Sequence, residues 1–255
     1  MKKTDAIAVF DSGVGGISVL GELRRLLPGE RYLYFGDSAN APYGTRPTAE
    51  VQALTFAAVE RLLWETPLKA LVIACNTATT AAVSALRRKY PELIIIGIEP
   101  ALKLAASRFP GGNIGIMATE VTLREEKLGH LMDRVADHCQ IHKIPAPGLV
   151  ELVEQGLADS PQAEALLSGI LGPYVGKLDA LVLGCTHYPF ASKRISAVLG
   201  PGTALIDGGA GTARETQRRL AEAGLVENGP GSLTMTNSAP DPEMLELSWK
   251  LLHTF

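Results

Sequence analysis

Residues 70–77 read ALVIACNT, and residues 180–187 read ALVLGCTH. Each segment is an apolar run that ends in a cysteine and continues into small polar residues. A continuous apolar run is typical of a strand covered on both faces, as in a parallel sheet. A fainter pair, residues 7–12 and 114–119, stands at nearly the same offset. These matches predict two similar halves, with Cys75 and Cys185 at equivalent positions.

Apolar runs of this kind alternate with helical patterns along most of the chain. The predicted strands are residues 7–10, 32–35, 70–74, 94–98, 113–117, 141–144, 178–184 and 204–206. The predicted helices include residues 48–64, 79–89, 123–138 and 161–171. Alternating strands and helices are typical of α/β folds with parallel sheets. We therefore predict an α/β protein with two pseudo-symmetric parallel-sheet domains.

The chain is predicted to cross between the two domains twice. Residues 1–97 and 208–255 form the predicted first domain, and residues 98–207 form the second. The segment after Ile206 is too short for a domain, so we expect it to return and pack on the first half. Parallel sheets bind ligands at the carboxyl ends of their strands. Both cysteines should therefore reach one cleft between the domains, which is the predicted active site.

Composition excludes several classes of protein. The 255 residues are 46% hydrophobic and 20% charged, with a formal net charge of −3, as in an ordinary soluble globular protein. The interspersed charges form no basic stripe for nucleic acid and no polybasic cluster for a membrane surface. We expect no signal peptide and no membrane span, because no apolar run is long enough. Three cysteines are too few for a disulfide framework, so a cytoplasmic location is expected.

Two cysteines across a dry cleft can invert the α-carbon of an amino acid. Most enzymes that remove this proton use an electron sink such as pyridoxal phosphate. Without a cofactor, a thiolate can take the proton on one face while a thiol delivers another on the opposite face. Asp11, at the end of the first strand, and His187, beside Cys185, could tune the two thiols. The loop–helix starts at 11–16 and 76–80 offer backbone N–H groups to carboxylates.

Simpler interpretations exist for each of these residues. The cysteines could be packed strand-end residues, Asp11 or Ser12 a helix cap, and His187 a surface side chain. A dinucleotide site at 11–16 is disfavoured, because Ser18 stands at the third glycine position and Asp11 would face the pyrophosphate. Metal binding through the cysteines and His187 is disfavoured by the absence of zinc-type spacing. The segment 138–142, HCQIH, is predicted to be a helix end with a buried cysteine.

Five segments together resemble the glutamate racemase family. They are 9–16 (VFDSGVGG), 35–38 (FGDS), 42–44 (PYG), 74–79 (ACNTAT) and 183–189 (LGCTHYP), and the similarity runs from about residue 7 to residue 214. The resemblance implies two pseudo-symmetric domains that enclose the substrate, with no cofactor and no metal. It implies that Cys75 acts on D-glutamate and Cys185 on L-glutamate. Asp11 and His187 would assist these cysteines.

The resemblance also implies residues beyond the cysteines. Glu154 matches a further acidic position of the family. The implied substrate-binding residues are Asp11, Ser12, Pro42, Tyr43, Gly44, Asn76, Thr77, Thr119, Thr186 and His187. The partner is a small molecule, L- or D-glutamate, the implied role is supply of D-glutamate for bacterial peptidoglycan, and a homodimer is left open. Ala146 stands where family members often have a cysteine before proline.

Three other functions stay open on the sequence. A related two-cysteine racemase could act on aspartate or another amino acid. A cysteine hydrolase would use Cys185 with His187 and would not need Cys75. A non-enzymatic sensor of small acids would bind its ligand in the cleft and would need neither thiol.

Overall fold

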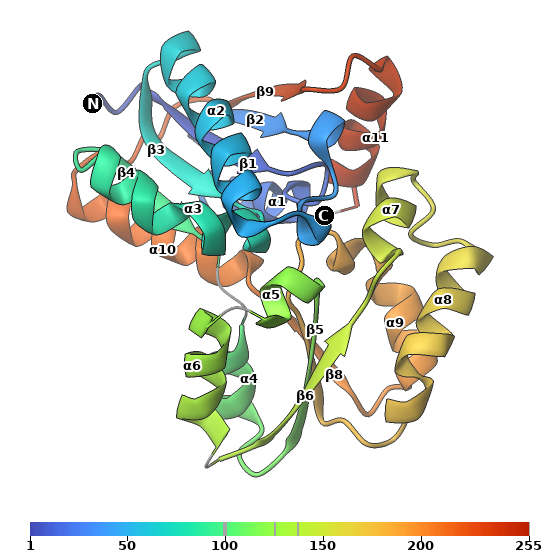
Figure 1. The fold of residues 1–255 in the computed structure, drawn as a ribbon. Coiled ribbons are helices and arrows are strands. Elements are labelled where there is room, and N and C mark those ends of the chain that lie inside the picture. The colour runs from blue at the N-terminus through green and yellow to red at the C-terminus, as the bar shows by residue number, and fades with distance from the viewer. Residues whose placement is uncertain (99–100, 125, 137, 255) are drawn as a thin grey trace.

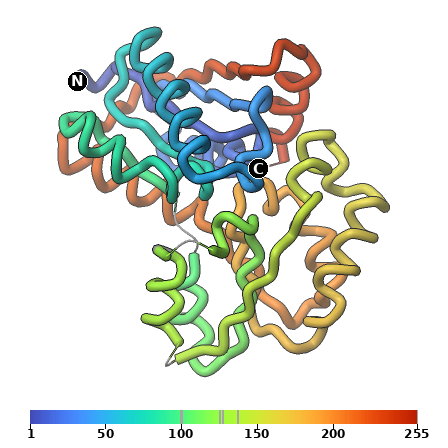
Figure 2. Tube along the Cα trace, in the orientation of Figure 1, coloured from blue at the N-terminus to red at the C-terminus, as the bar shows by residue number. Residues whose placement is uncertain are grey.

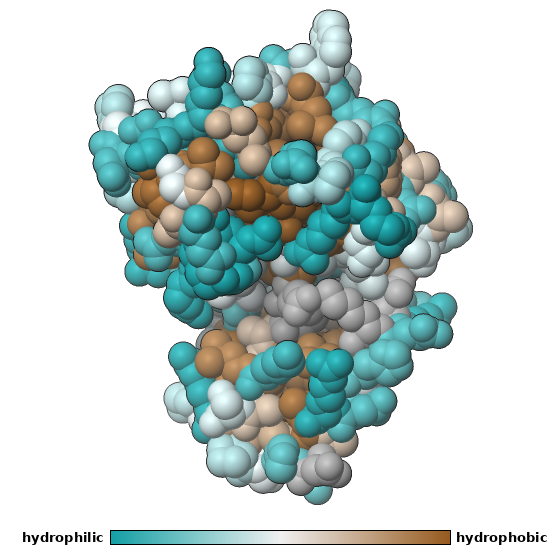
Figure 3. All heavy atoms as spheres, turned by 90° about the vertical axis from the view of Figure 1, so that its left-hand side faces the viewer, coloured by the Kyte–Doolittle hydropathy of each residue, from teal (hydrophilic) through white to brown (hydrophobic). Residues whose placement is uncertain are grey.

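A computed structural model describes residues 1–98, 101–124, 126–136 and 138–254. The chain forms two α/β domains, each built on its own parallel sheet. Seen from the side, they form an upper and a lower lobe (Figure 3). The predicted fold class, two parallel-sheet α/β domains, is confirmed.

The sheet of the first domain has five parallel strands in the order β4-β3-β1-β2-β9. They are β1 (Ala6–Asp11), β2 (Arg31–Gly36), β3 (Leu68–Ile73), β4 (Ile94–Gly97) and β9 (Ser232–Asn237). All six residues of β1 and of β3 are buried, as expected of central strands with helices on both faces. The apolar runs in the sequence therefore mark the centre of the sheet.

The sheet of the second domain has four parallel strands in the order β6-β5-β7-β8. They are β5 (Asn113–Ala118), β6 (Gln140–Pro145), β7 (Ala180–Leu183) and β8 (Ala204–Asp207). Read from β8, this order repeats the order β4-β3-β1-β2 of the first sheet. Under this correspondence β3 matches β7, so Cys75 and Cys185 follow equivalent strands. The internal similarity in the sequence therefore reflects a repeat of the fold.

Helices cover both faces of each sheet (Figure 1). The first domain contains α1 (Ile17–Leu26), η1 (Ser38–Asn40), η2 (Tyr43–Thr45), α2 (Thr48–Glu65), α3 (Asn76–Lys89), α10 (Gly209–Glu222) and α11 (Pro242–Leu252). The second contains α4 (Leu102–Arg108), α5 (Glu120–Arg124), α6 (Glu126–Ala136), α7 (Leu149–Glu154), α8 (Pro161–Leu171), η3 (Gly172–Tyr174), η4 (Tyr188–Ala191) and α9 (Ser192–Leu199). The predicted helix 123–138 corresponds to parts of α5 and α6, and its positions 125 and 137 lie outside the described residues.

The C-terminal segment returns to the first domain. Figure 2 shows the orange and red end of the tube beside the blue N-terminal part. Leu220 of α10 and Leu251 of α11 share a core with Leu20 of α1. β9 pairs with β2 at the edge of the sheet. We keep the domain boundaries at 97/98 and 207/208 as a proposal.

The described residues meet the requirements of neither a membrane-spanning helix nor a three-ligand metal site. Within them, no helix has both the length and the apolar character needed to span a bilayer. The same part of the chain holds no group of three or more His, Cys, Asp or Glu side chains placed to bind a metal ion.

Candidate active site

The carboxyl ends of the central strands meet between the two domains. Asp11 is the last residue of β1, and the cysteines follow β3 and β7 by two residues. Cys75 is 5% exposed and Cys185 is 8% exposed. Ser12, which follows Asp11, donates to Cys75 Sγ, and Asp11 itself accepts from Thr186, which follows Cys185, so Asp11 and Ser12 contact both cysteine-bearing segments. The structure thus brings the two cysteines and Asp11 together.

Cys75 lies at the start of α3 as its N-cap residue. Its Sγ accepts hydrogen bonds from Ser12 Oγ at 3.3 Å and from the backbone N of Ala78 at 3.4 Å. Burial raises the pKa of the Cys75 thiol to about 12, and the negative charge of Asp11 adds to this shift, while the two hydrogen bonds oppose it. Cys75 is therefore a protonated thiol at neutral pH in the free chain, which suits a proton donor.

Asp11 links the two domains. Its Oδ1 accepts a hydrogen bond from Gly13 N at 3.0 Å, and its Oδ2 accepts one from Thr186 Oγ1 of the second domain at 2.9 Å. Burial raises the pKa of Asp11, against the positive charge of His187 and these two hydrogen bonds. The residue does not cap α1, because Gly16 holds the N-cap position. Asp11 influences Cys75 through its charge.

Cys185 contacts a histidine, which in turn contacts a carboxylate. His187 Nδ1 lies 3.7 Å from Cys185 Sγ, and His187 Nε2 lies 2.7 Å from Glu154 Oε1. Burial alone would lower the pKa of His187, but its contacts with Cys185 and Glu154 outweigh burial and raise this pKa well above 6.5. For Glu154, burial is outweighed by His187 and by two hydrogen bonds, so its pKa is lowered. The pair is therefore an imidazolium and a carboxylate at neutral pH.

The glycine-rich loop of the first domain packs against this pair. A Cβ atom on Gly13 would lie 1.8 Å from Glu154 Oε1, and one on Gly15 would lie 2.3 Å from His187 Nδ1. Val14 N donates a hydrogen bond to Glu154 Oε1 at 2.7 Å. The glycines let the second domain approach this closely. A carboxylate thus occupies the place at this loop where a dinucleotide site would hold phosphate.

Three predicted substrate residues present polar groups beside the cysteines. Asn76 Oδ1 is buried and, among the described residues, has no hydrogen-bond partner. A buried orphan acceptor is costly unless a ligand supplies a donor, and an α-ammonium is such a donor. Thr77 Oγ1 lies 3.3 Å from Thr119 Oγ1 across the domain interface. These hydroxyls are placed to meet a polar ligand.

Thr122 belongs to the same cluster and is absent from the sequence-based predictions. Its hydroxyl lies 3.0 Å from Thr119 Oγ1 and 3.5 Å from Thr77 Oγ1. The spacing Thr119-x-x-Thr122 at the start of α5 was the available signal, because a threonine just before a helix accepts from the backbone N–H three residues on, as Thr119 Oγ1 does from Thr122 N at 3.3 Å.

In the predicted segment 42–44, the side chain of Tyr43 packs into the first domain and the backbone faces the site. The Tyr43 hydroxyl donates to Asp37 Oδ2 at 2.6 Å, and its ring packs 6.4 Å from the Phe10 ring. The side chain of Tyr43 therefore points into the first domain, and the backbone groups of Tyr43 are left to contact a ligand. Gly44 faces the second domain, since a Cβ there would lie 2.6 Å from Thr119 Cγ2. Asp37, which had no predicted role, anchors this segment.

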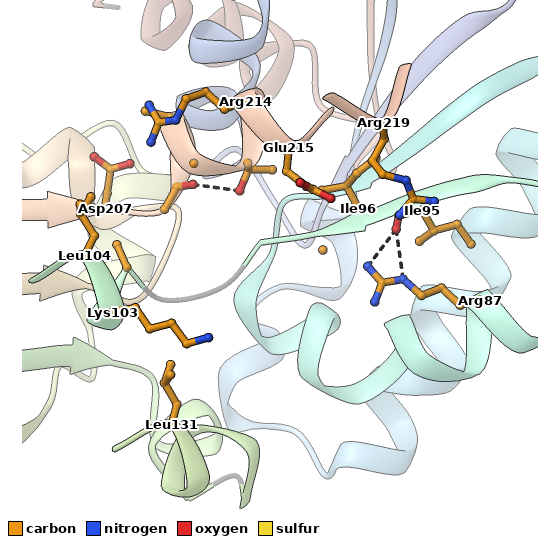
Figure 4. A pocket seen from close by; sticks show the side chains of 16 residues that line it. Arg87, Ile95, Ile96, Lys103, Leu104, Leu131, Asp207, Arg214, Glu215 and Arg219 are labelled. Carbon is orange, nitrogen blue, oxygen red and sulfur yellow. Dashed lines mark hydrogen bonds between the residues drawn. The ribbon is translucent and has the colours of Figure 1, made fainter. Parts of the chain in front are cut away.

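Cavities lie on both sides of Pro42. One of about 240 Å³ is also lined by Gly44 and Thr119, and another of about 280 Å³ by Ser38 and Glu154. A larger cavity of about 470 Å³ lies where the chain crosses between the domains (Figure 4). Its described lining includes Lys103 and Arg219 and none of the predicted site residues. We place the candidate site at the two cysteines, because Asp11, Glu154 and His187 converge there.

Comparisons with known proteins show the family to which the chain belongs. The family model described as Asp/Glu/Hydantoin racemase matches residues 16–216. A glutamate racemase of Clostridium botulinum (strain Alaska E43 / Type E3) is 47% identical over 256 residues, which cover 99% of this chain and 99% of that protein.

Solved structures of glutamate racemases share the whole fold. An isoform from Bacillus anthracis is 32% identical with a TM-score of 0.88, over 98% of this chain and 95% of that one. The Escherichia coli enzyme, solved with L-glutamate and the activator UDP-MurNAc-Ala, is 34% identical with a TM-score of 0.87, over 98% and 95%. This chain is therefore an amino-acid racemase, an isomerase, and it belongs to the Asp/Glu/hydantoin racemase family as a member of its glutamate racemase group.

Proposed function

We propose that this chain interconverts L- and D-glutamate by proton transfer between Cys75 and Cys185, without a cofactor. One observation carries the proposal: two buried thiols follow equivalent strands of the two sheets, and Asp11 and Ser12 contact both thiol-bearing segments. Each thiol has its own polar set, with Ser12 on one side and His187 on the other. The names of the relatives point to glutamate as the substrate.

The reaction from L- to D-glutamate uses each thiol once. The Cys185 thiolate removes the α-proton, so that the Cα–H bond breaks and an S–H bond forms. The Cys75 thiol then protonates the opposite face of the carbanion and is left as a thiolate. The pKa of about 12 for Cys75 supports its role as the donor in this direction. The reaction of D-glutamate runs the same steps in reverse.

Charged neighbours support the two thiols in different ways. The imidazolium of His187 supplies positive charge beside Cys185 Sγ, which a thiolate base needs. The contacts with Cys185 and Glu154 favour the protonated form of His187. On the other side, the Asp11 carboxylate favours the protonated form of Cys75 until an ammonium group enters the site. Substrate binding would then lower the pKa of Cys75 and ready it as a base for D-glutamate.

Polar groups of both domains would hold the substrate. Asn76 Oδ1 is proposed to accept from the ammonium. The backbone N–H groups at the N-terminus of α3 suit a carboxylate. The hydroxyls of Ser12 and Thr186, which donate to Cys75 and Asp11 in the free chain, would turn to it on binding. Thr77 and Thr119, with the backbone at 42–44, suit the other carboxylate. Pro42 lines both cavities beside this segment. The enclosed position implies that the domains open for exchange of substrate and product.

The biological setting follows from this activity. We propose that the chain works in the cytoplasm and supplies D-glutamate for bacterial peptidoglycan. Its small-molecule partner is glutamate itself, and a homodimer is compatible with this role.

Deuterium incorporation at the α-carbon tests the proposal. Each glutamate enantiomer is followed by NMR in D2O without added cofactor, with wild type beside Cys75→Ser and Cys185→Ser. We expect exchange by wild type that is lost or becomes one-sided in the variants. Absence of exchange by folded wild type would contradict the proposal. Comparing turnover of L-aspartate with that of L-glutamate would then test the aspartate alternative.

A further inference from the structure

Two side chains of the first domain reach Glu154. Ser38 Oγ donates a hydrogen bond to Glu154 Oε2 at 3.0 Å. Asn237 Nδ2 donates to Ser38 Oγ, also at 3.0 Å. Ser38 begins η1 just after β2, and Asn237 is the last residue of β9. The two strands are in register at Gly36 and Asn237, so the sheet itself sets this contact.

The line of contacts continues to a thiol in the other domain. Glu154 Oε1 lies 2.7 Å from His187 Nε2, and His187 Nδ1 lies 3.7 Å from Cys185 Sγ. α7, which ends at Glu154, lies at the border between the domains (Figure 1). The edge strand of the first sheet is thus connected to Cys185 through four side chains.

The directions of the first two hydrogen bonds, from Asn237 to Ser38 and from Ser38 to Glu154, are fixed. Asn237 Oδ1 accepts from Ala239 N at 2.8 Å, which turns the amide nitrogen toward Ser38. A serine hydroxyl has one proton to donate. Because Asn237 is the donor to Ser38, the proton of Ser38 is left for the Glu154 carboxylate. Gly36 leaves space for the amide, since a Cβ there would lie 3.0 Å from Asn237 Nδ2.

The carboxylate is bound from both domains. Ser38 and the backbone of Val14 belong to the first domain, whereas His187 belongs to the second. Opening of the cleft would remove both bonds from the first domain and leave Glu154 with His187 alone. The orientation of Glu154, and through it of His187, therefore depends on the closed arrangement.

We propose that Ser38 and Asn237 are positioning residues for proton transfer at Cys185. Through them, this proton transfer depends on closure of the two domains. The proposal rests on the proposed function, because it requires Cys185 to act as an acid and a base. Neither residue contacts the substrate in this scheme. Their effect passes through Glu154 and His187.

Kinetic isotope effects distinguish this role from general loosening. If transfer at Cys185 slows, breaking the Cα–H bond becomes rate-limiting with L-glutamate, and the isotope effect on kcat with α-deuterated L-glutamate rises. With D-glutamate, reprotonation by Cys185 becomes rate-limiting instead, so the isotope effect with α-deuterated D-glutamate falls toward one. A lesion that only destabilises the fold would move both values together.

Four variants and one control make up the experiment. Ser38→Ala removes the donor to Glu154 and should lower kcat about tenfold, the size expected for a hydrogen bond to a charged group. Asn237→Asp keeps the size of the side chain and the bond to Ala239, but it only accepts. The proton of Ser38 then turns to the new carboxylate, so this variant should lose at least as much kcat as Asn237→Ala. Ser238→Ala is the matched control, because Ser238 Oγ accepts from Ala39 N in the same turn without contacting Glu154.

The proposal predicts that in Ser38→Ala and Asn237→Asp the isotope effect on kcat rises with α-deuterated L-glutamate and falls with α-deuterated D-glutamate. Ser238→Ala should show the wild-type isotope effects. Ser38→Thr, which keeps the hydroxyl, should restore both values. Equal changes for both enantiomers, the same changes in Ser238→Ala, or a milder loss in Asn237→Asp than in Asn237→Ala would overturn it. If wild type showed no α-hydrogen exchange at all, the proposed function would fail first and this proposal with it.

Discussion

Gly13 of the first domain and Glu154 of the second lie in direct contact, with room for no side chain between them. A Cβ atom on Gly13 would stand 1.8 Å from Glu154 Oε1, far inside van der Waals contact. The neighbouring Val14 N donates to the same oxygen at 2.7 Å. The two domains therefore pack closely against each other at Glu154, which pairs with His187 beside Cys185.

Gly13→Ala should separate this contact and reduce activity. The added methyl displaces Glu154 or holds the domains apart, so the hydrogen bond from Val14 N to a charged carboxylate is lost. Such a bond contributes about 1.5–3 kcal/mol, and we expect kcat/KM for L-glutamate to fall by roughly 10- to 100-fold. A circular dichroism spectrum of the variant should match wild type.

A matched glycine provides the control for this variant. Gly169 lies inside α8 with open space around its Cα, so Gly169→Ala should leave activity unchanged. It should also stabilise the fold by about 0.5–1 kcal/mol, because alanine is the better helix former. Full activity in Gly13→Ala would show that the contact with Glu154 has no part in catalysis.

Glu154→Gln should lower the pKa of His187, because the hydrogen bond and the charge of Glu154 both raise it. In wild type, the protonated pair stabilises the fold fully below the ordinary histidine value of 6.5, and this stabilisation is lost as pH rises through the raised pKa. In the variant the loss should begin at lower pH. NMR titration of the His187 imidazole, together with urea unfolding across pH, measures both effects.

A second part of this prediction concerns the acidic range. The pKa of Glu154 is lowered, so its contribution to stability is present above its ordinary value of 4.5 and is lost as pH falls through the lowered pKa. Glu154→Gln should therefore unfold with less dependence on acidic pH than wild type. An unchanged His187 titration in the variant would refute the pairing.

Sequence patterns predicted the strands that lie at the centre of the sheets. β1 and β3 are buried on both faces, and burial requires continuous apolar runs that are visible without a structure. β9 was not predicted, because Ser232–Asn237 alternates polar residues and buries only Met235 at the edge of the sheet. An edge strand is defined by its neighbour and less by its own composition.

The same reasoning explains which site residues could be found. Cys75 and Cys185 follow predicted strands, so their meeting follows from the topology of parallel sheets. Ser38 and Asn237 stand 199 positions apart, and only the fold brings them together. The segment 35–38 was noted in the sequence, yet the role of Ser38 depends on a carboxylate in the other domain.

Cys75 should react slowly with iodoacetamide in the free chain, because its thiol pKa of about 12 leaves little thiolate at neutral pH. Asp11→Asn removes a negative charge that raises this pKa, so alkylation of Cys75 should become faster by about tenfold at pH 8. Mass spectrometry of peptides containing Cys75 gives the rate, in a Cys139→Ser background that removes the third thiol.

Asp133→Asn, on the exposed face of α6, is the control for charge and should leave the rate unchanged. If Cys75 in wild type were alkylated as fast as a free cysteine, the buried thiol would be a thiolate at rest. The assignment of Cys75 as the proton donor in the reaction from L- to D-glutamate would then be wrong.

Lys69 and Glu30 form a fully buried ion pair at the amino-terminal edge of the first sheet. Lys69 Nζ lies 2.5 Å from Glu30 Oε2, and both side chains are 0% exposed. Lys69 also donates to Leu225 O at 2.9 Å, and Glu30 Oε1 accepts from Glu227 N at 2.9 Å. The pair thereby fastens the segment that leads from α10 to β9, on which Asn237 depends for its position.

Lys69→Met should destabilise the fold by about 3–5 kcal/mol, because it leaves the Glu30 carboxylate buried and unpaired. The double variant Lys69→Met/Glu30→Gln should recover part of this loss, since no uncompensated charge remains. Arg61→Met, which breaks the exposed pair with Glu65, should cost less than about 1 kcal/mol. Urea unfolding at pH 7 measures all three, and a loss in Lys69→Met as small as that in Arg61→Met would mean that water reaches Glu30.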